Sequence, residues 1–132
     1  MASLKATLSL SSAAGQVSSD ALSFSVTDTA TVKAPIVNMS KITATTTGGD
    51  TVILPSTSTT RYVYIKHLGL NSAGGSSGAD QVKVELADNT RVIDLSKDEF
   101  CFLPYRAEGA GALQLEASAN TVQVEYAYFT RA

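Results

Sequence analysis

The chain contains little of what most catalytic and metal-binding sites require. It has no tryptophan, one cysteine and one histidine among 132 residues, and only 17% of its residues are charged. A single thiol, Cys101, cannot form an internal disulfide and excludes the multi-cysteine zinc sites. A single histidine, His67, allows at most one Ser-His-Asp triad. The sequence therefore favours a protein without a metal, a cofactor or an active site, and it does not by itself identify an activity.

Basic charge and long apolar segments are also scarce. The chain has 10 Lys and Arg against 12 Asp and Glu, whereas nucleic-acid binding requires a basic surface that displaces counterions from phosphates. No apolar run approaches the roughly 20 residues that span a bilayer. The first ten residues alternate between apolar and polar instead of forming the apolar core of a signal peptide. We expect no nucleic-acid partner, no membrane partner and synthesis in the cytoplasm.

The residues that are abundant favour β-strands. Val, Ile and Thr together account for 31 residues, and branching at Cβ suits a pleated sheet better than a helix. Strong helix formers never accumulate without an interrupting Gly, Pro or Ser/Thr cluster. The composition therefore predicts an all-β protein.

Alternation of apolar and polar residues locates the strands. Strands of this type are bounded by turn residues such as Gly48-Gly49-Asp50 and Asp88-Asn89, and Pro35 interrupts any strand that passes through it. The pattern predicts strands at 4–10, 22–27, 37–46 with a bulge near 40–41, 51–54, 61–68, 82–86, 91–95, 99–103, 112–118 and 121–130. Eight to ten short strands without a helix predict an antiparallel β-sandwich, which we expect to be jelly-roll-like.

The two parts of the chain differ in composition. Residues 1–60 are rich in Ser, Thr and Ala and contain one aromatic residue, Phe24, whereas eight aromatic residues follow. We expect residues 1–132 to form a single β domain in which 61–132 is the main sandwich body. Residues 1–60 are either peripheral strands or an interaction arm that pairs with another chain.

The candidates for catalysis have simpler structural explanations. His67 is in phase with Val63 and Ile65, which is typical of a histidine within a sheet; a catalytic role would require an acid and a hydroxyl beside it. Cys101 lies between Phe100 and Phe102, where a thiol is usually a small core residue with a raised pKa. We therefore expect no enzyme activity.

The aromatic and arginine residues of the second part are candidates for contacts. Tyr128 and Arg131 lie near the C-terminus, where the last strand either closes the core or reaches a subunit interface. Tyr and Arg are enriched at protein interfaces. The predicted contact residues are Tyr62, Tyr64, Arg106, Tyr128 and Arg131.

Three segments carry a resemblance to a known group of proteins. They are Arg-Tyr-Val-Tyr-Ile-Lys-His-Leu-Gly at 61–69, Val-Ile-Asp-Leu-Ser-Lys-Asp-Glu-Phe-Cys-Phe-Leu-Pro at 92–104 and Val-Gln-Val-Glu-Tyr at 122–126. Together they resemble the small β-sandwich structural proteins of tailed bacteriophages over about half of the chain. The resemblance implies a non-catalytic virion component that is assembled in the host cytoplasm. Its expected roles are a capsid decoration (cement) protein or a tail, collar or fibre subunit.

The same resemblance implies the partners. A decoration protein binds the major capsid protein or other virion proteins and commonly forms a homo-oligomer, of which a trimer is one form. Two alternatives remain. A carbohydrate- or receptor-binding sandwich would show Tyr62, Tyr64 and Tyr105 exposed beside Asp or Asn. An enzyme would show a cleft that joins His67 to an acid and a hydroxyl.

Overall fold

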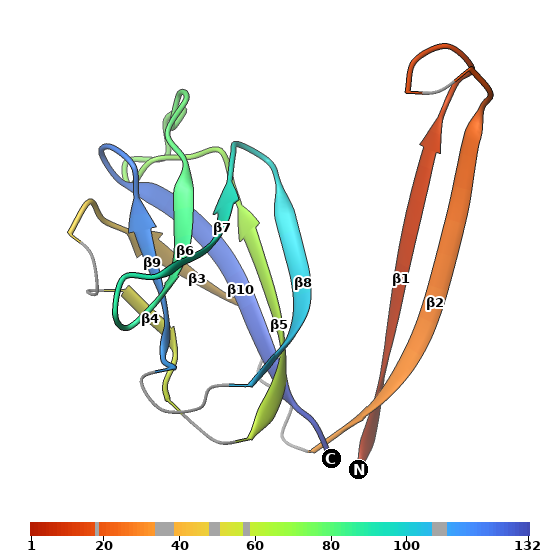
Figure 1. Ribbon diagram of the computed structural model, residues 1–132. Helices are drawn as coiled ribbons and strands as arrows, with labels where there is room; N and C mark the ends of the chain where they lie inside the picture. Colours follow the sequence, from red (N-terminus) through yellow and green to blue (C-terminus); the bar gives the residue numbers. More distant parts are fainter. Residues whose placement is uncertain (18, 34–38, 48–50, 57–58, 107–110) are drawn as a thin grey trace. The chain divides into compact units, whose positions relative to one another are not determined.

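The computed structural model describes residues 1–17, 19–33, 39–47, 51–56, 59–106 and 111–132. Those residues contain ten β-strands, all paired antiparallel, and no helix (Figure 1). The predicted all-β class and the sandwich are confirmed. The turn expected at 48–50 and the interruption at Pro35 lie outside the described residues. The chain divides into two compact units, Met1–Ala34 together with Ala132, and Pro35–Arg131.

The first unit is a long β-hairpin. Its strands β1 (Ala2–Ser12) and β2 (Leu22–Val32) pair over their whole length without a register shift. Residues that are paired across an antiparallel ladder point to the same face, and successive residues point to opposite faces. The alternating sequence therefore gives the hairpin one apolar face and one face of serine and threonine.

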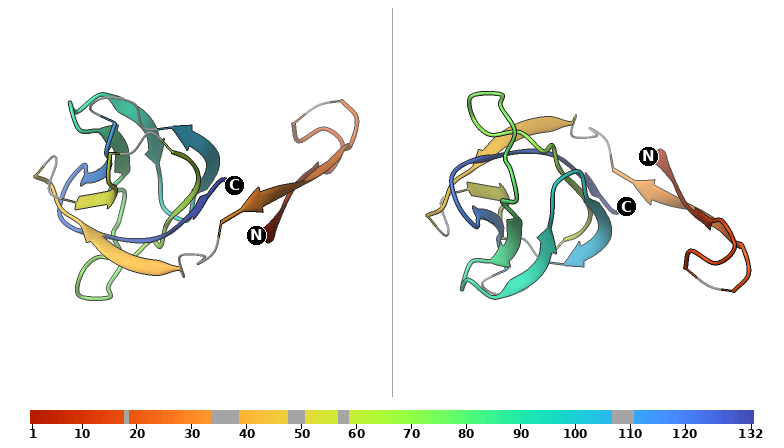
Figure 2. Two further views of the ribbon diagram at one scale, coloured as in Figure 1. Left: turned by 90° about the horizontal axis from the view of Figure 1, so that it is seen from below. Right: turned by 90° about the horizontal axis from the view of Figure 1, so that it is seen from above.

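The second unit is a sandwich of two four-stranded sheets. One sheet has the order β3 (Ser40–Ala44), β10 (Val122–Thr130), β5 (Thr60–His67), β8 (Phe100–Arg106). The other has the order β4 (Thr51–Leu54), β9 (Leu113–Ala117), β6 (Val82–Leu86), β7 (Arg91–Leu95). Views along the strands show that the sheets lie on opposite sides of a common interior (Figure 2).

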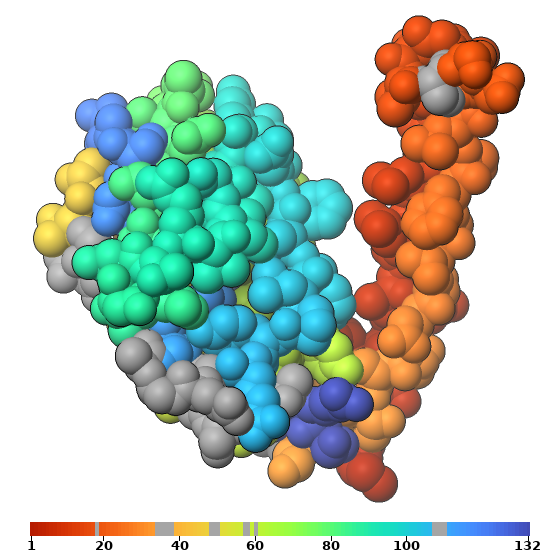
Figure 3. All heavy atoms as spheres, in the orientation of Figure 1, coloured from red at the N-terminus to blue at the C-terminus, as the bar shows by residue number. Residues whose placement is uncertain are grey.

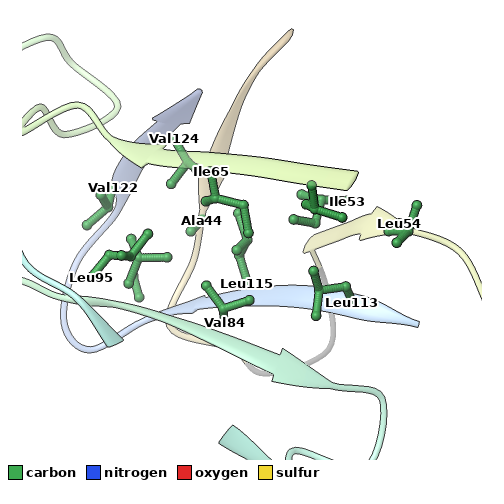
Figure 4. Close-up of a cluster of buried hydrophobic side chains, with 13 residues drawn as sticks. Ala44, Ile53, Leu54, Ile65, Val84, Leu95, Leu113, Leu115, Val122 and Val124 are labelled. Atoms are coloured by element: carbon green, nitrogen blue, oxygen red, sulfur yellow. The ribbon is translucent and has the colours of Figure 1, made fainter. Parts of the chain in front are cut away.

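Side chains from both sheets fill this interior (Figure 4). Ile65 and Val124 come from one sheet, Val84 and Leu115 come from the other, and all four are fully buried. Burying a side chain of this size stabilises a fold by about 1.5–3 kcal/mol. The core of the second unit is therefore made by the alternate residues that the sequence pattern placed on one face of each strand.

The boundary between the units differs from the expected division near residue 60. Both β3 and β4 belong to the sandwich, where Ala44 and Leu54 are fully buried and Ile53 is 3% exposed. The Ser- and Thr-rich composition obscured this because the two strands are short, and β3 buries only the small residue Ala44. The expectation of a separate arm therefore applies to residues 1–34 and not to residues 1–60.

Three of the tight turns depend on residues that tolerate a left-handed backbone. Asn89, Asp98 and Asn120 have φ values of 63°, 68° and 53°. Asn and Asp adopt this conformation more readily than other non-glycine residues because their short side chains bond to the local backbone. The turn expected from the sequence at Asp88-Asn89 is confirmed.

Candidate interaction surfaces

His67 is a core residue held by two hydrogen bonds. Its side chain is fully buried at the end of β5. The ring Nδ1 accepts a hydrogen bond from the Gly69 backbone N–H at 2.9 Å, so Nε2 carries the proton and donates it to the Asp80 carbonyl oxygen at 2.9 Å. Both ring nitrogens are therefore engaged by backbone groups, which is the structural role expected from the sequence and leaves neither nitrogen for catalysis.

Cys101 lies on the inner face of β8. Its side chain packs against the core, and burial raises the pKa of the thiol to about 11. A thiol with this pKa is almost entirely protonated at neutral pH, and the protonated form is a poor nucleophile. The expectation of a small core residue with a raised pKa is confirmed.

The acidic residues beside this strand serve a turn. Asp98 adopts a left-handed backbone, and the Glu99 carboxylate accepts a hydrogen bond from the Ser96 backbone N–H at 2.7 Å. Both acids are exposed. Across the described parts of the chain, no group of three or more His, Cys, Asp or Glu side chains could hold a metal ion.

The sheet β4-β9-β6-β7 turns a charged face outward, and Figure 3 shows β6 and β7 at the surface. Lys83 lies opposite Glu116 on one neighbouring strand and Asp94 on the other, and it forms an ion pair with Glu116. Glu85 lies between Gln114 and Arg91 in the next row. Cross-strand pairs of opposite charge are typical of a solvated sheet face.

Glu85 is the exception on this charged face because it is only 4% exposed. Burial raises the pKa of its carboxyl group, the charge of Glu116 raises it further, and Lys83 and Arg91 lower it. Its Oε2 atom is buried and has no hydrogen-bond partner among the residues that the structure describes. An ionised Glu85 is consequently poorly solvated and costs stability.

The sheet β3-β10-β5-β8 turns aromatic side chains outward instead. The register places Phe129, Tyr62 and Pro104 in one row, and Ala127, Tyr64 and Phe102 in the next. Phe100 is 60% exposed and Phe102 is 40% exposed. We call the following residues the aromatic face: Tyr62, Tyr64, Phe100, Phe102 and Phe129.

Contacts within the aromatic face hold it in shape. The rings of Tyr62 and Phe102 are stacked, with centroids 6.0 Å apart and planes inclined by 3°. The Tyr64 hydroxyl donates to the Glu125 carboxylate at 3.3 Å, and burial together with the negative charge of Glu125 raises the pKa of that phenol. The face is therefore a set of packed rings of which Phe100 and Phe102 are exposed to solvent and the other three are half-buried. Exposed apolar patches of this kind mark interaction sites.

The remaining predicted contact residues have different positions. Arg106 is exposed and follows Pro104 on the same side of β8. Tyr128 faces the interior, where its ring packs against the core and lies 5.2 Å from the Arg61 guanidinium. Arg131 is exposed beyond the end of β10. The structure thus brings Tyr62 and Tyr64 together on one outer surface and places Tyr128 as a residue that closes the core.

The hairpin carries a second uncovered apolar surface. Its large side chains all lie on one face and are 38–50% exposed. We call them the hairpin apolar face: Leu8, Leu10, Leu22, Phe24 and Val26. Hydroxyl groups occupy the opposite face, where Thr7 bonds to Thr27 at 2.9 Å and Ser9 bonds to Ser25 at 3.1 Å.

Sequence reasoning missed Phe100 and Phe102 as surface residues. β8 has apolar side chains on both faces, since Cys101, Leu103 and Tyr105 alternate with Phe100, Phe102 and Pro104. A strand of that kind is normally read as buried on both sides. The exposed position of Phe102 could have been inferred from Tyr62 and Tyr64 on the neighbouring strand, because their large side chains lie on the same outer surface.

Comparison with known protein families, curated proteins and solved structures found no match to this chain. In the part of the chain that the structure describes, no helix has the length and apolar character needed to cross a membrane.

Proposed function

We propose that this protein is a non-enzymatic structural component of a virus particle, a decoration protein that binds the capsid shell of a tailed bacteriophage. The observation that carries the proposal is the β1–β2 hairpin, a separate unit whose apolar face is uncovered. Two-stranded hairpins are marginally stable in water unless another surface covers them. A protein of this design is suited to contacts with neighbouring subunits.

The order of strands in the sandwich supports the proposal. Strand β3 lies beside β10, β4 beside β9, β5 beside β8 and β6 beside β7. We infer from this nested pairing that the sandwich is of the jelly-roll type, which is common among viral capsid and lectin domains. This is an argument from fold, and the same fold hosts other functions.

The resemblance of residues 61–69, 92–104 and 122–126 to phage sandwich proteins supplies the virion assignment. The roles of His67 and Cys101 agree with it, since both residues are engaged in the core. The hairpin also offers a means of shell attachment. Within its own unit the hairpin is a two-stranded sheet, so each of its strands has a strand partner on one edge, and the other edge of β2 accepts a bond from the Ala132 N–H to the Thr31 oxygen. Unpaired strand edges can add to a sheet of a neighbouring protein.

Binding to assembled heads tests the function. The purified protein is mixed with heads assembled from the major capsid protein of the same phage and with the unassembled capsid protein, and bound protein is measured after sedimentation. We expect saturable binding to assembled heads and none to the unassembled subunit. No binding to either sample would contradict a shell role. Retention of the protein on immobilised glycans instead would indicate the receptor-binding alternative.

A further inference from the structure

We propose that the hairpin apolar face of one copy packs on the aromatic face of a second copy, so that neighbouring copies exchange hairpins. This inference rests on the proposed function in that it names the partner of the hairpin, although the contact itself needs no shell. It is carried by two uncovered apolar surfaces of the same chain, and each requires a cover that the other can provide.

The hairpin apolar face and the aromatic face both expose large apolar side chains to solvent. Phe24 and Val26 on the hairpin are 49% and 50% exposed, and Phe100 and Phe102 on the sandwich are 60% and 40% exposed. The outer face of the other sheet is charged, with Lys83 paired to Glu116. The aromatic face is therefore the surface of the sandwich that suits an apolar partner.

The two surfaces also match in length and charge. Both extend over four residue steps, 22–26 on β2 and 100–104 on β8, which is about 14 Å at the usual rise of a strand. Two residues further along, β2 carries Asp28 and β8 carries Arg106. An alignment of 22–28 with 100–106 thus brings Asp28 opposite Arg106.

The area favours a reciprocal exchange. The aligned segments 22–28 and 100–106 are about 20 Å long, and the hairpin is about 10 Å wide for its two strands, so each surface contributes about 200 Å². One contact then buries about 400 Å² over both surfaces, and two reciprocal contacts bury about 800 Å², which is the size of a weak interface. Two hairpins packed face to face over residues 22–30 would form one contact of about 540 Å². The exchange therefore buries the larger area.

Cross-linking with introduced cysteines tests the contact in the full chain. Phe24→Cys and Phe102→Cys are made separately in a Cys101→Ala background, with a mass tag on one of the two proteins. The proteins are mixed in equal amounts and oxidised mildly. We expect a disulfide-linked heterodimer. The matched control is Ser25→Cys, which is adjacent in sequence but on the hydroxyl face, and we expect at least 10-fold less heterodimer from it.

Two other arrangements give different products. Disulfides between two Phe24→Cys chains in preference to the heterodimer would show that hairpins pack on each other. A chain that carries both cysteines and closes its disulfide as a monomer would show that the hairpin covers its own sandwich. Either product would overturn the exchange.

A measurement without cross-linking provides the second test. Sedimentation equilibrium of the unmodified protein gives the dissociation constant of the oligomer. Val26→Ser removes an apolar contact from the hairpin, and we expect it to weaken association at least 10-fold, with Ser25→Ala as the nearly neutral control. A purely monomeric protein would overturn the proposal. Exchange without binding to heads would refute the shell role alone, and head binding by a monomer would refute the exchange alone.

Discussion

Replacement of His67 tests whether the only histidine of the chain has a structural role. The ring is fully buried, accepts a hydrogen bond from Gly69 and donates one to Asp80. His67→Ala leaves the buried Gly69 N–H and the half-buried Asp80 carbonyl without a partner, at about 1 kcal/mol each, and a cavity that costs about 2 kcal/mol more. We expect the free energy of unfolding to fall by about 4 kcal/mol.

The assay is urea unfolding followed by circular dichroism, with thermal unfolding in parallel. A loss of about 4 kcal/mol corresponds to a decrease in Tm of about 20 °C for a domain of this size. The matched control is Lys66→Ala, because Lys66 lies on the opposite face of β5, and we expect it to change stability by less than about 0.5 kcal/mol. A loss below about 1 kcal/mol for His67→Ala would refute the assigned role of the ring.

Three further predictions concern Glu85, Cys101 and Gly69. The pKa of Glu85 is raised in the folded state, so its contribution to stability is present below the ordinary carboxyl pKa and is lost as the pH rises through the folded value. Glu85→Gln should therefore raise Tm at pH 7 and change it less at pH 4, and an equal effect at both pH values would contradict this. With a thiol pKa of about 11, Cys101 should react with iodoacetamide at pH 8 roughly two orders of magnitude more slowly than free cysteine, as mass spectrometry would detect. Gly69 has a φ of +71°, and a Cβ there would lie 2.9 Å from Lys97 Cε, so Gly69→Ala should lower the unfolding free energy by about 1–2 kcal/mol in urea titrations.

Much of the fold can be predicted from the sequence because alternation determines which residues share a face. Val63, Ile65 and His67 were placed together from their spacing, and all three are buried. The turn at Asp88-Asn89 is also predicted from its residue types, and Asn89 has a φ of 63°. These features depend on local sequence alone.

Other features depend on contacts that local sequence does not contain. Ala44 and Leu54 are buried because the opposite sheet covers them, although both belong to the Ser- and Thr-rich first 60 residues. Phe102 is exposed although β8 has apolar side chains on both faces. Only the inner face of its sheet is covered by the opposite sheet, and Phe102 lies on the outer face. Similarly, the position of Tyr128 toward the core is decided by its pairing with Val63.

Light scattering of the purified full-length chain tests most directly whether the hairpin and the aromatic face bind neighbouring copies. We predict that the unmodified protein has a mass of two or more chains and that Phe24→Ser together with Val26→Ser shifts it to the mass of one chain while circular dichroism stays unchanged. A single-chain mass for the unmodified protein, or an oligomer that both substitutions leave intact, would contradict the account.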